Sequence, residues 1–596
     1  MANQPSRTLM CNAEQRAALM RVAAGTEPAD MLLLNGSVVN VYTGEIMENC
    51  PVAIKGKWIA AVGPDAASAA GKSTLVYDAA GKTLAPGLID GHTHAWFFTM
   101  EAFLPYAIKG GVTTIITETL EFLPVAGCEG IAEHLDAIGE QPIKILATAP
   151  AFISTSMAQN NYSEKFLEKL LERDDIVGIG ESFWQAVLQD PEAMTQRFQM
   201  ALDRGKLLEG HSAGAKGKKL AAYAASGISS CHEPITCKEA LDLLRLGIYV
   251  MIREGSVRKD LQNISPIAQT GVDLRRLILV TDSVEPVELV EKGYLEVVVQ
   301  KAIDSGFDPV SAIQMATLNV AEHFGLDSVI GGISPGRCAD ILVLPDAKTI
   351  APEMVISNGR IVYRDRKLLA APRKHRYSEN ALRSIRLEKP FTSTDFDICT
   401  ASGSNAPRTV RVIDMVSDLV SKESHLEVFP VEGKIRCDLG RDIVKVAAID
   451  YRHYPGRSFT GLIKGFGIKK GAMACSAAWD CSDLIVVGAD EEDMAAAAER
   501  VRQLPGGAVV CEEGKITAEL PLPIFSILSD LDMESLAERV KSVRRAAGDL
   551  GMHFPDPLLS LCVLTSAAIP YLKICEEGLV NLKDGKTYPL EVSCLT

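Results

Sequence analysis

Short apolar runs alternate with amphipathic stretches through the middle of the chain. Eight of these runs have the length of buried strands: residues 88–94, 113–118, 144–150, 177–181, 207–212, 228–232, 249–254 and 277–282. Stretches with helical spacing lie between most of them, for example residues 163–172 and 238–245. Eight strand–helix repeats over roughly 250 residues predict a (β/α)8 TIM barrel, which we place at residues 85–332. A helix over residues 309–324, with Asp308 as N-cap and Pro309 at its first position, is expected to close the barrel.

The segments on either side of the barrel are β-rich and predict one composite domain. Residues 31–84 contain short apolar runs split by glycine turns, which is typical of a small antiparallel β-module. Residues 333–370 show the same pattern, and we interpret them as the second half of a β-sandwich-like domain. Residues 1–30 are expected to form a helical lead-in, with Asn12 as the N-cap of a helix over residues 12–24.

The last third of the chain predicts a further domain of α+β type. Residues 371–408 are rich in charge, proline and serine and are interpreted as a linker. Within residues 409–596 we expect strands at 443–449 and 484–488, and helices at 491–503 and 533–547. The predicted fold class is therefore α/β: a TIM barrel flanked by a composite β-domain and a C-terminal α+β domain.

Composition indicates which kinds of binding partner to expect and in which cellular compartment the protein works. The chain has 596 residues, enough for about two to four domains, and a net charge of −15 that argues against nucleic-acid or anionic-membrane binding. Its 14 cysteines are scattered, without a tight Cys-x-x-Cys pair, which favours reduced thiols in a cytoplasmic protein. No signal peptide is evident in residues 1–27, and the apolar stretch 558–572 is too short to span a bilayer. We expect a homo-oligomer, a dimer or larger, because closed symmetric assemblies are common.

Candidate chemistry gathers at the ends of the predicted barrel strands. His92 and His94 are two residues apart on a strand, so their imidazoles point to the same side. The other residues at equivalent places are His211 and His232, with the carboxylates Glu181 and Asp282. Alone, such a histidine could be structural and such a carboxylate could cap a helix. All six at the catalytic rim of a barrel predict a site for two divalent ions such as Mn²⁺, Fe²⁺ or Zn²⁺.

The same ligand set predicts hydrolysis of a C–N bond. Two metal ions lower the pKa of a shared water towards neutrality. We expect Glu181 to bridge them. Asp282 is expected to bind one ion, take the proton of the water and pass it to a leaving nitrogen. His232 or a metal would stabilise the developing charge on an attacked sp² carbon.

The chain resembles the amidohydrolase superfamily and, within it, adenine deaminase of the bacterial type over nearly its whole length. The motifs that carry the resemblance are His92-Thr93-His94, residues 210–211, 224–233, 244–256, 465–471 and 519–523. The resemblance implies a binuclear centre, often of Mn or Fe, in which a glutamate takes the place of the carboxylated lysine of many relatives. It also implies hydrolytic attack on a purine ring.

Four motifs depart from that family pattern. After His-x-His the family usually has Ile-Glu-Ser-Ser, where this chain has residues 95–98, Ala-Trp-Phe-Phe. The usual Asp-Pro-His-Glu is Glu-Thr-Leu-Glu at 118–121, which keeps Glu121 but lacks the histidine. Asp282 is followed by Ser283 in place of a second aspartate, and His-Asp-Ser-His becomes Trp-Asp-Cys-Ser at 479–482.

Three hypotheses follow for the function. In the first two, the substrate is a small-molecule purine base. The resemblance favours deamination of adenine, giving hypoxanthine and ammonia. The altered motifs are compatible instead with ring opening of an oxopurine such as xanthine, and a non-catalytic purine- or protein-binding homologue is the third. We predict Trp96, Glu121 and Arg253 as substrate-binding residues. Trp96 could equally pack the rim, and Arg253 could equally pair with Glu254 or another acid.

Overall fold

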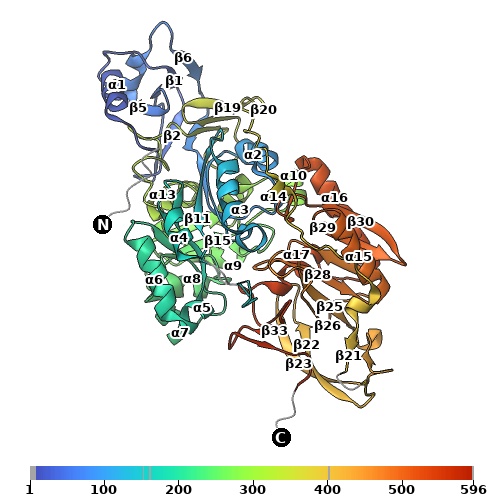
Figure 1. Cartoon of the computed structure of the whole chain (residues 1–596). Coiled ribbons are helices and arrows are strands. Elements are labelled where there is room, and N and C mark those ends of the chain that lie inside the picture. The colour runs from blue at the N-terminus through green and yellow to red at the C-terminus, as the bar shows by residue number, and fades with distance from the viewer. Residues whose placement is uncertain (1–8, 152–153, 160–162, 401–402, 593–596) are drawn as a thin grey trace.

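The computed structural model describes residues 9–151, 154–159, 163–400 and 403–592 (Figure 1). Eight parallel strands form the central sheet in the order β16-β15-β14-β13-β12-β11-β10-β8, which confirms the predicted barrel. All eight predicted strands are present: β8 (Leu88–Thr93), β10 (Val112–Thr117), β11 (Lys144–Ala149), β12 (Ile176–Phe183), β13 (Leu207–His211), β14 (Ser230–Cys231), β15 (Tyr249–Arg253) and β16 (Leu277–Val280).

Polar contacts beyond the regular ladder connect the first and last strands of the barrel. The backbone N–H of Asp282 donates to the carbonyl of His92 at 3.1 Å. The buried carboxylate of Asp90, on β8, accepts hydrogen bonds of 2.6 Å from the hydroxyls of Thr281 and Tyr294. These contacts fix the end of β16 beside the end of β8, so that His92 and Asp282 lie at one place on the rim.

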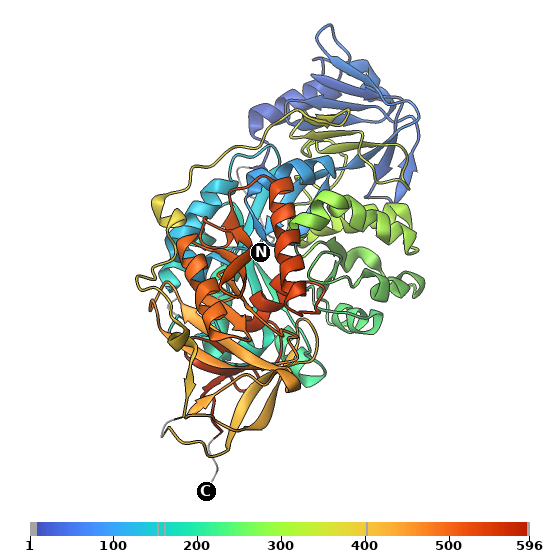
Figure 2. The ribbon, with the colours of Figure 1, turned by 90° about the vertical axis from the view of Figure 1, so that its right-hand side faces the viewer.

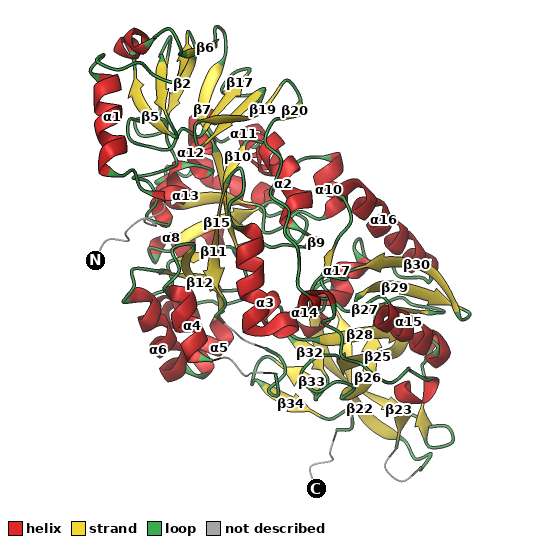
Figure 3. Cartoon of the chain, turned by 45° about the horizontal axis from the view of Figure 1, so that its top comes forward, coloured by secondary structure: helices red, strands yellow, loops and turns green. Residues whose placement is uncertain are grey.

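Helices surround the sheet, as a (β/α)8 architecture requires (Figure 3). The main ones are α2 (Met100–Lys109), α3 (Phe122–Ile138), α4 (Glu164–Leu171), α5 (Trp184–Gln189), α6 (Pro191–Leu202), α7 (Lys218–Ala224), α8 (Cys237–Arg245), α10 (Pro286–Glu291) and α11 (Leu295–Asp304). The helix expected over residues 309–324 is instead two helices, α12 (Pro309–Met315) and α13 (Leu318–His323). The break lies at Thr317, whose backbone is not helical and whose hydroxyl bonds back to the carbonyl of Ile313. Asp308 caps α12 as predicted.

Two sheets form the β-rich part of the molecule. One has the order β5-β4-β1-β6 and the other β20-β19-β18-β17-β7-β2-β3. Their strands are β1 (Met31–Leu34), β2 (Ser37–Asn40), β3 (Glu45–Met47), β4 (Val52–Lys55), β5 (Trp58–Val62), β6 (Leu75–Asp78), β7 (Thr83–Pro86), β17 (Ile341–Leu344), β18 (Met354–Ser357), β19 (Arg360–Arg364) and β20 (Lys367–Leu368). Helix α1 (Ala13–Ala23) begins at the predicted cap, Asn12.

The larger of these sheets joins the two flanking segments. Strand β17 pairs antiparallel with β7, so residues 341–344 lie beside residues 83–86 (Figures 1 and 2). On this pairing we propose residues 31–84 and 333–370 as one composite domain. The module is not wholly antiparallel as expected, because β6 returns through the 3-10 helix Pro64–Ala69 to pair parallel with β1, and β2 is parallel to β7.

The C-terminal part is built on a sheet of order β23-β22-β26-β25-β28-β27-β29-β30. Its strands are β22 (Arg408–Met415), β23 (Ser421–Val428), β25 (Ile443–Asp450), β26 (Ser458–Lys464), β27 (Ala472–Cys475), β28 (Asp483–Gly488), β29 (Gly507–Glu512) and β30 (Lys515–Pro521). The predicted helices are α15 (Glu491–Gln503) and α16 (Met533–Asp549), followed by α17 (Pro557–Cys562) and a small sheet of β32 (Leu572–Cys575), β33 (Gly578–Asn581) and β34 (Lys586–Tyr588).

This C-terminal part packs against the barrel, on the side away from the composite β-domain (Figures 1 and 2). On α16, Arg544 reaches Glu285 at 3.2 Å and Lys541 reaches Glu291 at 2.9 Å. Strand β31 (Leu528–Ser529) pairs with β9 (Phe97–Phe98), directly after the first barrel strand. In the described part of residues 371–408, the guanidinium of Arg373 donates to the carbonyl of Gly139 in the barrel at 2.9 Å, and the carbonyl of Phe396 accepts a 2.8 Å hydrogen bond from Lys445 of the C-terminal part. The segment contains α14 (Glu379–Leu382) and stays a predicted linker. No described helix is long and apolar enough to cross a membrane.

Candidate metal centre

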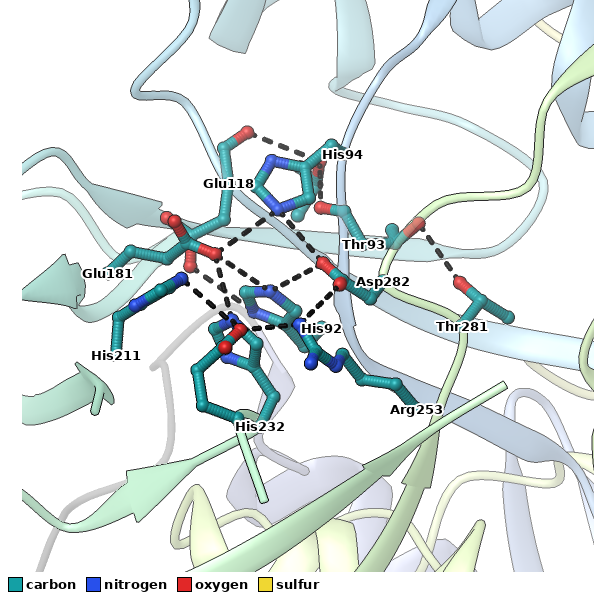
Figure 4. A network of polar contacts seen from close by, with 12 residues as sticks. His92, Thr93, His94, Glu118, Glu181, His211, His232, Arg253, Thr281 and Asp282 are labelled. Atoms are coloured by element: carbon teal, nitrogen blue, oxygen red, sulfur yellow. Dashed lines mark hydrogen bonds and ion pairs between the residues drawn. The ribbon is translucent and has the colours of Figure 1, made fainter. Parts of the chain in front are cut away.

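Four imidazoles and two carboxylates from five barrel strands converge at one end of the barrel (Figure 4). His92 is in β8, Glu181 in β12 and His211 at the end of β13. His94 and His232 follow directly after β8 and β14, and Asp282 is the second residue after β16. The structure thus brings together all six residues that the sequence predicted as ligands.

The six residues form two groups with the donor types and spacing of metal sites. His92, His94, Glu181 and Asp282 make one group, and Glu181, His211 and His232 make the other. In each group the ligand atoms lie within 4.8 Å of one another. Glu181 belongs to both groups and therefore lies between them, which is where the bridging carboxylate was predicted.

Short distances connect the members of the cluster. Glu181 Oε1 lies 3.3 Å from His92 Nε2, 3.4 Å from His94 Nε2 and 3.1 Å from His232 Nε2. Asp282 Oδ1 lies 3.3 Å from Nε2 of both His92 and His94. Within the described chain the buried His92 Nε2 has no hydrogen-bond partner, although two carboxylate oxygens are near it. Imidazole nitrogens and carboxylate oxygens that face one another without a hydrogen bond are the arrangement expected of metal ligands.

Electrostatics favour anionic carboxylates in this cluster. Burial opposes ionisation of Glu181, but the neighbouring imidazoles of His232, His92 and His94 hold its pKa well below the usual range. The pKa of Asp282 is likewise lowered well below its usual range, against burial, by His92 and His94 and by the positive charges of His232 and Arg253. A divalent cation binds such a set by replacing protons on the imidazoles.

Two further glutamates, which sequence reasoning did not assign to the metal site, support the first pair of histidines. Glu118 Oε1 lies 3.5 Å from His92 Nδ1, and its other oxygen accepts a 2.7 Å hydrogen bond from Thr148. Glu121, predicted to bind substrate, hydrogen bonds His94 Nδ1. Carboxylates on the second ring nitrogen orient metal-binding histidines. Their position after β10, at the same rim, was the signal that could have assigned them.

Arg253 lies among acids rather than free in the pocket. Its guanidinium pairs with Glu233, with Asp260 at 3.1 Å and with Asp282 at 3.3 Å. Glu254, the other partner considered, pairs instead with Lys301 at 2.5 Å. Arg253 thus orients Asp282, and its contact with substrate stays a prediction. Sequence reasoning also missed Glu233, which follows His232 and lies 3.2 Å from His211 Nε2.

A cavity of about 1080 Å³ opens over this cluster. Its walls come from both the barrel and the C-terminal part: Glu181, His232 and Trp96 on one side, and Trp479, Asp480 and Ile527 on the other. The rings of Trp96 and Trp479 lie 6.0 Å apart, centroid to centroid. Trp96, predicted to bind substrate, does line the cavity, and its indole N–H has no partner among the described residues.

Comparison with known proteins shows which family has this architecture. The model of the Amidohydrolase family matches residues 83–362, and that of the Adenine deaminase C-terminal domain matches residues 418–586. The adenine deaminase of Clostridium botulinum (strain Loch Maree / Type A3) is 34% identical over 576 residues, which cover 94% of this chain and 95% of that protein. This chain belongs to the adenine deaminase family.

A second family member, the adenine deaminase of Moorella thermoacetica (strain ATCC 39073 / JCM 9320), is 36% identical over 579 residues, which cover 96% of this chain and 97% of that protein. Among solved structures, the crystal structure of an adenine deaminase is 20% identical, with a TM-score of 0.44 over 56% of this chain and 100% of that chain. As an amidohydrolase, the chain is a metal-dependent hydrolase, and its family implies a divalent metal.

Proposed function

We propose that the chain is an adenine deaminase that hydrolyses adenine to hypoxanthine and ammonia at a binuclear metal centre. The observation that carries the proposal is the pair of ligand groups sharing Glu181, at the base of a large cavity. The whole-length similarity to proteins named adenine deaminase supplies the substrate.

The residues present fit a binuclear centre. We assign His92, His94 and Asp282 to one ion, His211 and His232 to the other, with Glu181 shared. Imidazole nitrogen and carboxylate oxygen suit Mn²⁺, Fe²⁺ or Zn²⁺, and the resemblance favours Mn²⁺ or Fe²⁺. When bound, two such ions supply Lewis acidity that lowers the pKa of a water.

The side chains around the centre have distinct proposed roles. Asp282, kept anionic by its histidine neighbours and Arg253, accepts the proton of the attacking water and delivers it to the amine that leaves. His232 stabilises charge that develops on the purine. Trp96, Glu121 and Arg253 are the proposed substrate-binding residues. Trp96 offers a free indole N–H, and Glu121 Oε2 is buried without a partner in the described structure.

The findings weigh unequally on the other two hypotheses. Nothing in the relatives' names favours ring opening of an oxopurine such as xanthine. The intact ligand set argues against a non-catalytic homologue. For the whole protein we further propose a cytoplasmic homo-oligomer, a dimer or larger, that takes a purine base as its partner molecule and binds neither nucleic acid nor membrane.

The test is a turnover assay of Mn²⁺- or Fe²⁺-loaded protein with adenine and, separately, with xanthine. Formation of hypoxanthine with one ammonia per adenine supports the proposal. Loss of the ultraviolet band of xanthine, with adenine untouched, replaces it with ring opening. If both purines stay intact while both metals are bound, deamination and ring opening fail together. Metal-stripped protein is the control, because turnover at the proposed centre should be lost as the metal is removed.

A further inference from the structure

The C-terminal wall of the cavity carries a buried carboxyl group that the proposed roles leave unused. Asp480 lies between β27 and β28, is 5% exposed, and lines the same cavity as Glu181 and His232. It therefore faces the space in which the substrate is expected, from the domain that does not bind the metals.

The two oxygens of this carboxyl group have different surroundings. Oδ2 accepts hydrogen bonds from the hydroxyl of Ser566 at 3.0 Å and the backbone N–H of Ala567 at 2.9 Å. Within the described residues Oδ1 has no hydrogen-bond partner. One oxygen thus fixes the orientation of the side chain, and the other is left for a molecule in the cavity.

The backbone around Asp480 is held in an unusual conformation. Its φ is +64°, a region that non-glycine residues seldom adopt. The Asp480 carbonyl accepts a 2.8 Å hydrogen bond from Ser154 of the barrel, and the preceding carbonyl, of Trp479, accepts one of 2.6 Å from Thr565. Strained conformations fixed by several neighbours are concentrated at functional sites.

Asp480 also lacks a cationic partner. Across the described residues, no lysine, arginine or histidine nitrogen lies within ion-pair distance of its carboxyl group. Burial is the main reason that its pKa rises to about 7. The hydrogen bonds from Ser566 and Ala567 oppose the rise, and the negative charges of Glu181 and Glu121 add to it. A carboxyl group in such surroundings can stay protonated near neutral pH and donate a hydrogen bond.

We propose that Asp480 is a substrate-binding residue whose Oδ1–H donates a hydrogen bond to a ring nitrogen of the purine. The inference deepens the proposed function and rests on it. The ring nitrogens of adenine that carry no hydrogen are acceptors, whereas the barrel wall is rich in carboxylates that only accept. A donor from the C-terminal domain adds to the indole N–H of Trp96 on the barrel wall and makes that domain part of substrate recognition.

The experiment compares adenine with 1-deaza-, 3-deaza- and 7-deazaadenine, each of which lacks one ring nitrogen. Binding to the metal-loaded protein is measured by calorimetry for a base that is not turned over, and KM and kcat are measured for a base that is. Asp480→Ala is expected to weaken adenine binding about tenfold or more, because a buried donor is lost. Asp480→Asn keeps a donor and is expected to stay within about threefold of wild type. One deaza analogue is expected to bind wild type more weakly than adenine does, yet to bind Asp480→Ala about as well as adenine does.

Controls separate recognition from folding. Asp493→Asn alters a carboxyl group of the same domain that is 5% exposed, accepts two backbone N–H bonds and does not line the cavity. This variant is expected to bind adenine like wild type. Asp480→Leu replaces Asp480→Ala if the alanine variant does not fold.

The outcomes also separate this inference from the proposed function. Equal adenine affinity for wild type and Asp480→Ala, or no coupling of Asp480 to any of the three ring nitrogens, overturns the inference. Adenine that binds but is not converted contradicts the proposed function, while the binding series still decides the role of Asp480. If wild type does not bind adenine at all, both fail.

Discussion

Replacing Asp282 by asparagine should abolish most of the activity while leaving the fold in place. The residue is 4% exposed, and Oδ1 lies 3.3 Å from the nearest nitrogens of His92 and His94. Asparagine has the same shape, but its amide neither binds a cation as strongly nor accepts the proton of a water. Loss of a positioned general base lowers rates about 10²–10⁴-fold, which corresponds to about 3–5 kcal/mol of activation free energy.

The structure limits the expected cost in stability. Arg253, the partner of Asp282 Oδ2 at 3.3 Å, keeps its contacts with Glu233 and Asp260 when Asp282 becomes neutral. One charge-assisted hydrogen bond is then weakened, so we expect a loss of about 1–3 kcal/mol in the free energy of unfolding. The variant should therefore be purified as a folded protein.

The assay combines hypoxanthine formation, metal content and chemical denaturation on the same preparations. Asp260→Asn is the matched control, because Asp260 pairs with the same guanidinium but belongs to neither ligand group. We expect it to keep activity within about tenfold of wild type while losing similar stability. The reasoning is refuted if Asp282→Asn, with its metals bound, works within tenfold of wild type. It is also refuted if Asp260→Asn is equally inactive.

Four further predictions concern the metal ions, the glutamate beside a metal-binding histidine, a tryptophan that lines the cavity and a buried histidine. Chelation should remove activity and lower the melting temperature, and Mn²⁺ or Fe²⁺ should restore both; activity that survives complete removal of metal contradicts the assignment. Glu118→Gln should weaken metal binding about 10–100-fold, measured by competition with a chelating dye, because the support of His92 Nδ1 is weakened; unchanged affinity would show that Glu118 has no such role. Trp96→Ala should raise KM for adenine more than it lowers kcat, since the ring lines the cavity; the reverse split would count against substrate contact. Burial lowers the pKa of His134 to about 3, whereas a histidine in the unfolded chain has a pKa of about 6.5. When the pH drops below about 6.5, the unfolded state therefore binds a proton that the folded state does not bind. The free energy of unfolding should then decrease, by up to about 1.4 kcal/mol per pH unit. Urea titrations of wild type and His134→Phe should show a flatter fall for the variant, and parallel curves would refute this.

The barrel could be predicted because its strands are local signals. Each is a short apolar run that ends at a polar residue, and parallel strands place their ends on one rim. His92, His211 and Asp282 could therefore be grouped although they are far apart in sequence. The break at Thr317 could not be predicted in the same way, because it depends on a hydroxyl returning to the carbonyl of Ile313 within an otherwise helical pattern.

Residues that contact the predicted metal ligands were harder to predict than the ligands themselves. Glu118, Glu121 and Glu233 act through the second nitrogen of a histidine or through Arg253, and such contacts depend on side-chain directions that spacing does not fix. Asp480 was harder still, because nothing in the barrel pattern indicates which C-terminal loop reaches the cavity. The strand pair β9–β31, which joins residues 97–98 to residues 528–529, is a long-range contact of two short segments.

That strand pair changes how the departures from the family motif are understood. Residues 95–98 and residues 479–482 are separated by almost the whole barrel and a domain boundary in sequence, yet Trp96 and Trp479 meet across the cavity at 6.0 Å. The two altered motifs are therefore one altered surface: an aromatic pair lines the cavity over the ligand cluster, where the family pattern places polar side chains. Because the six predicted ligands are all present on the barrel side, we expect the change to affect how a base is held rather than how water is activated. Selectivity among aminopurines is thus expected to depend on both domains together.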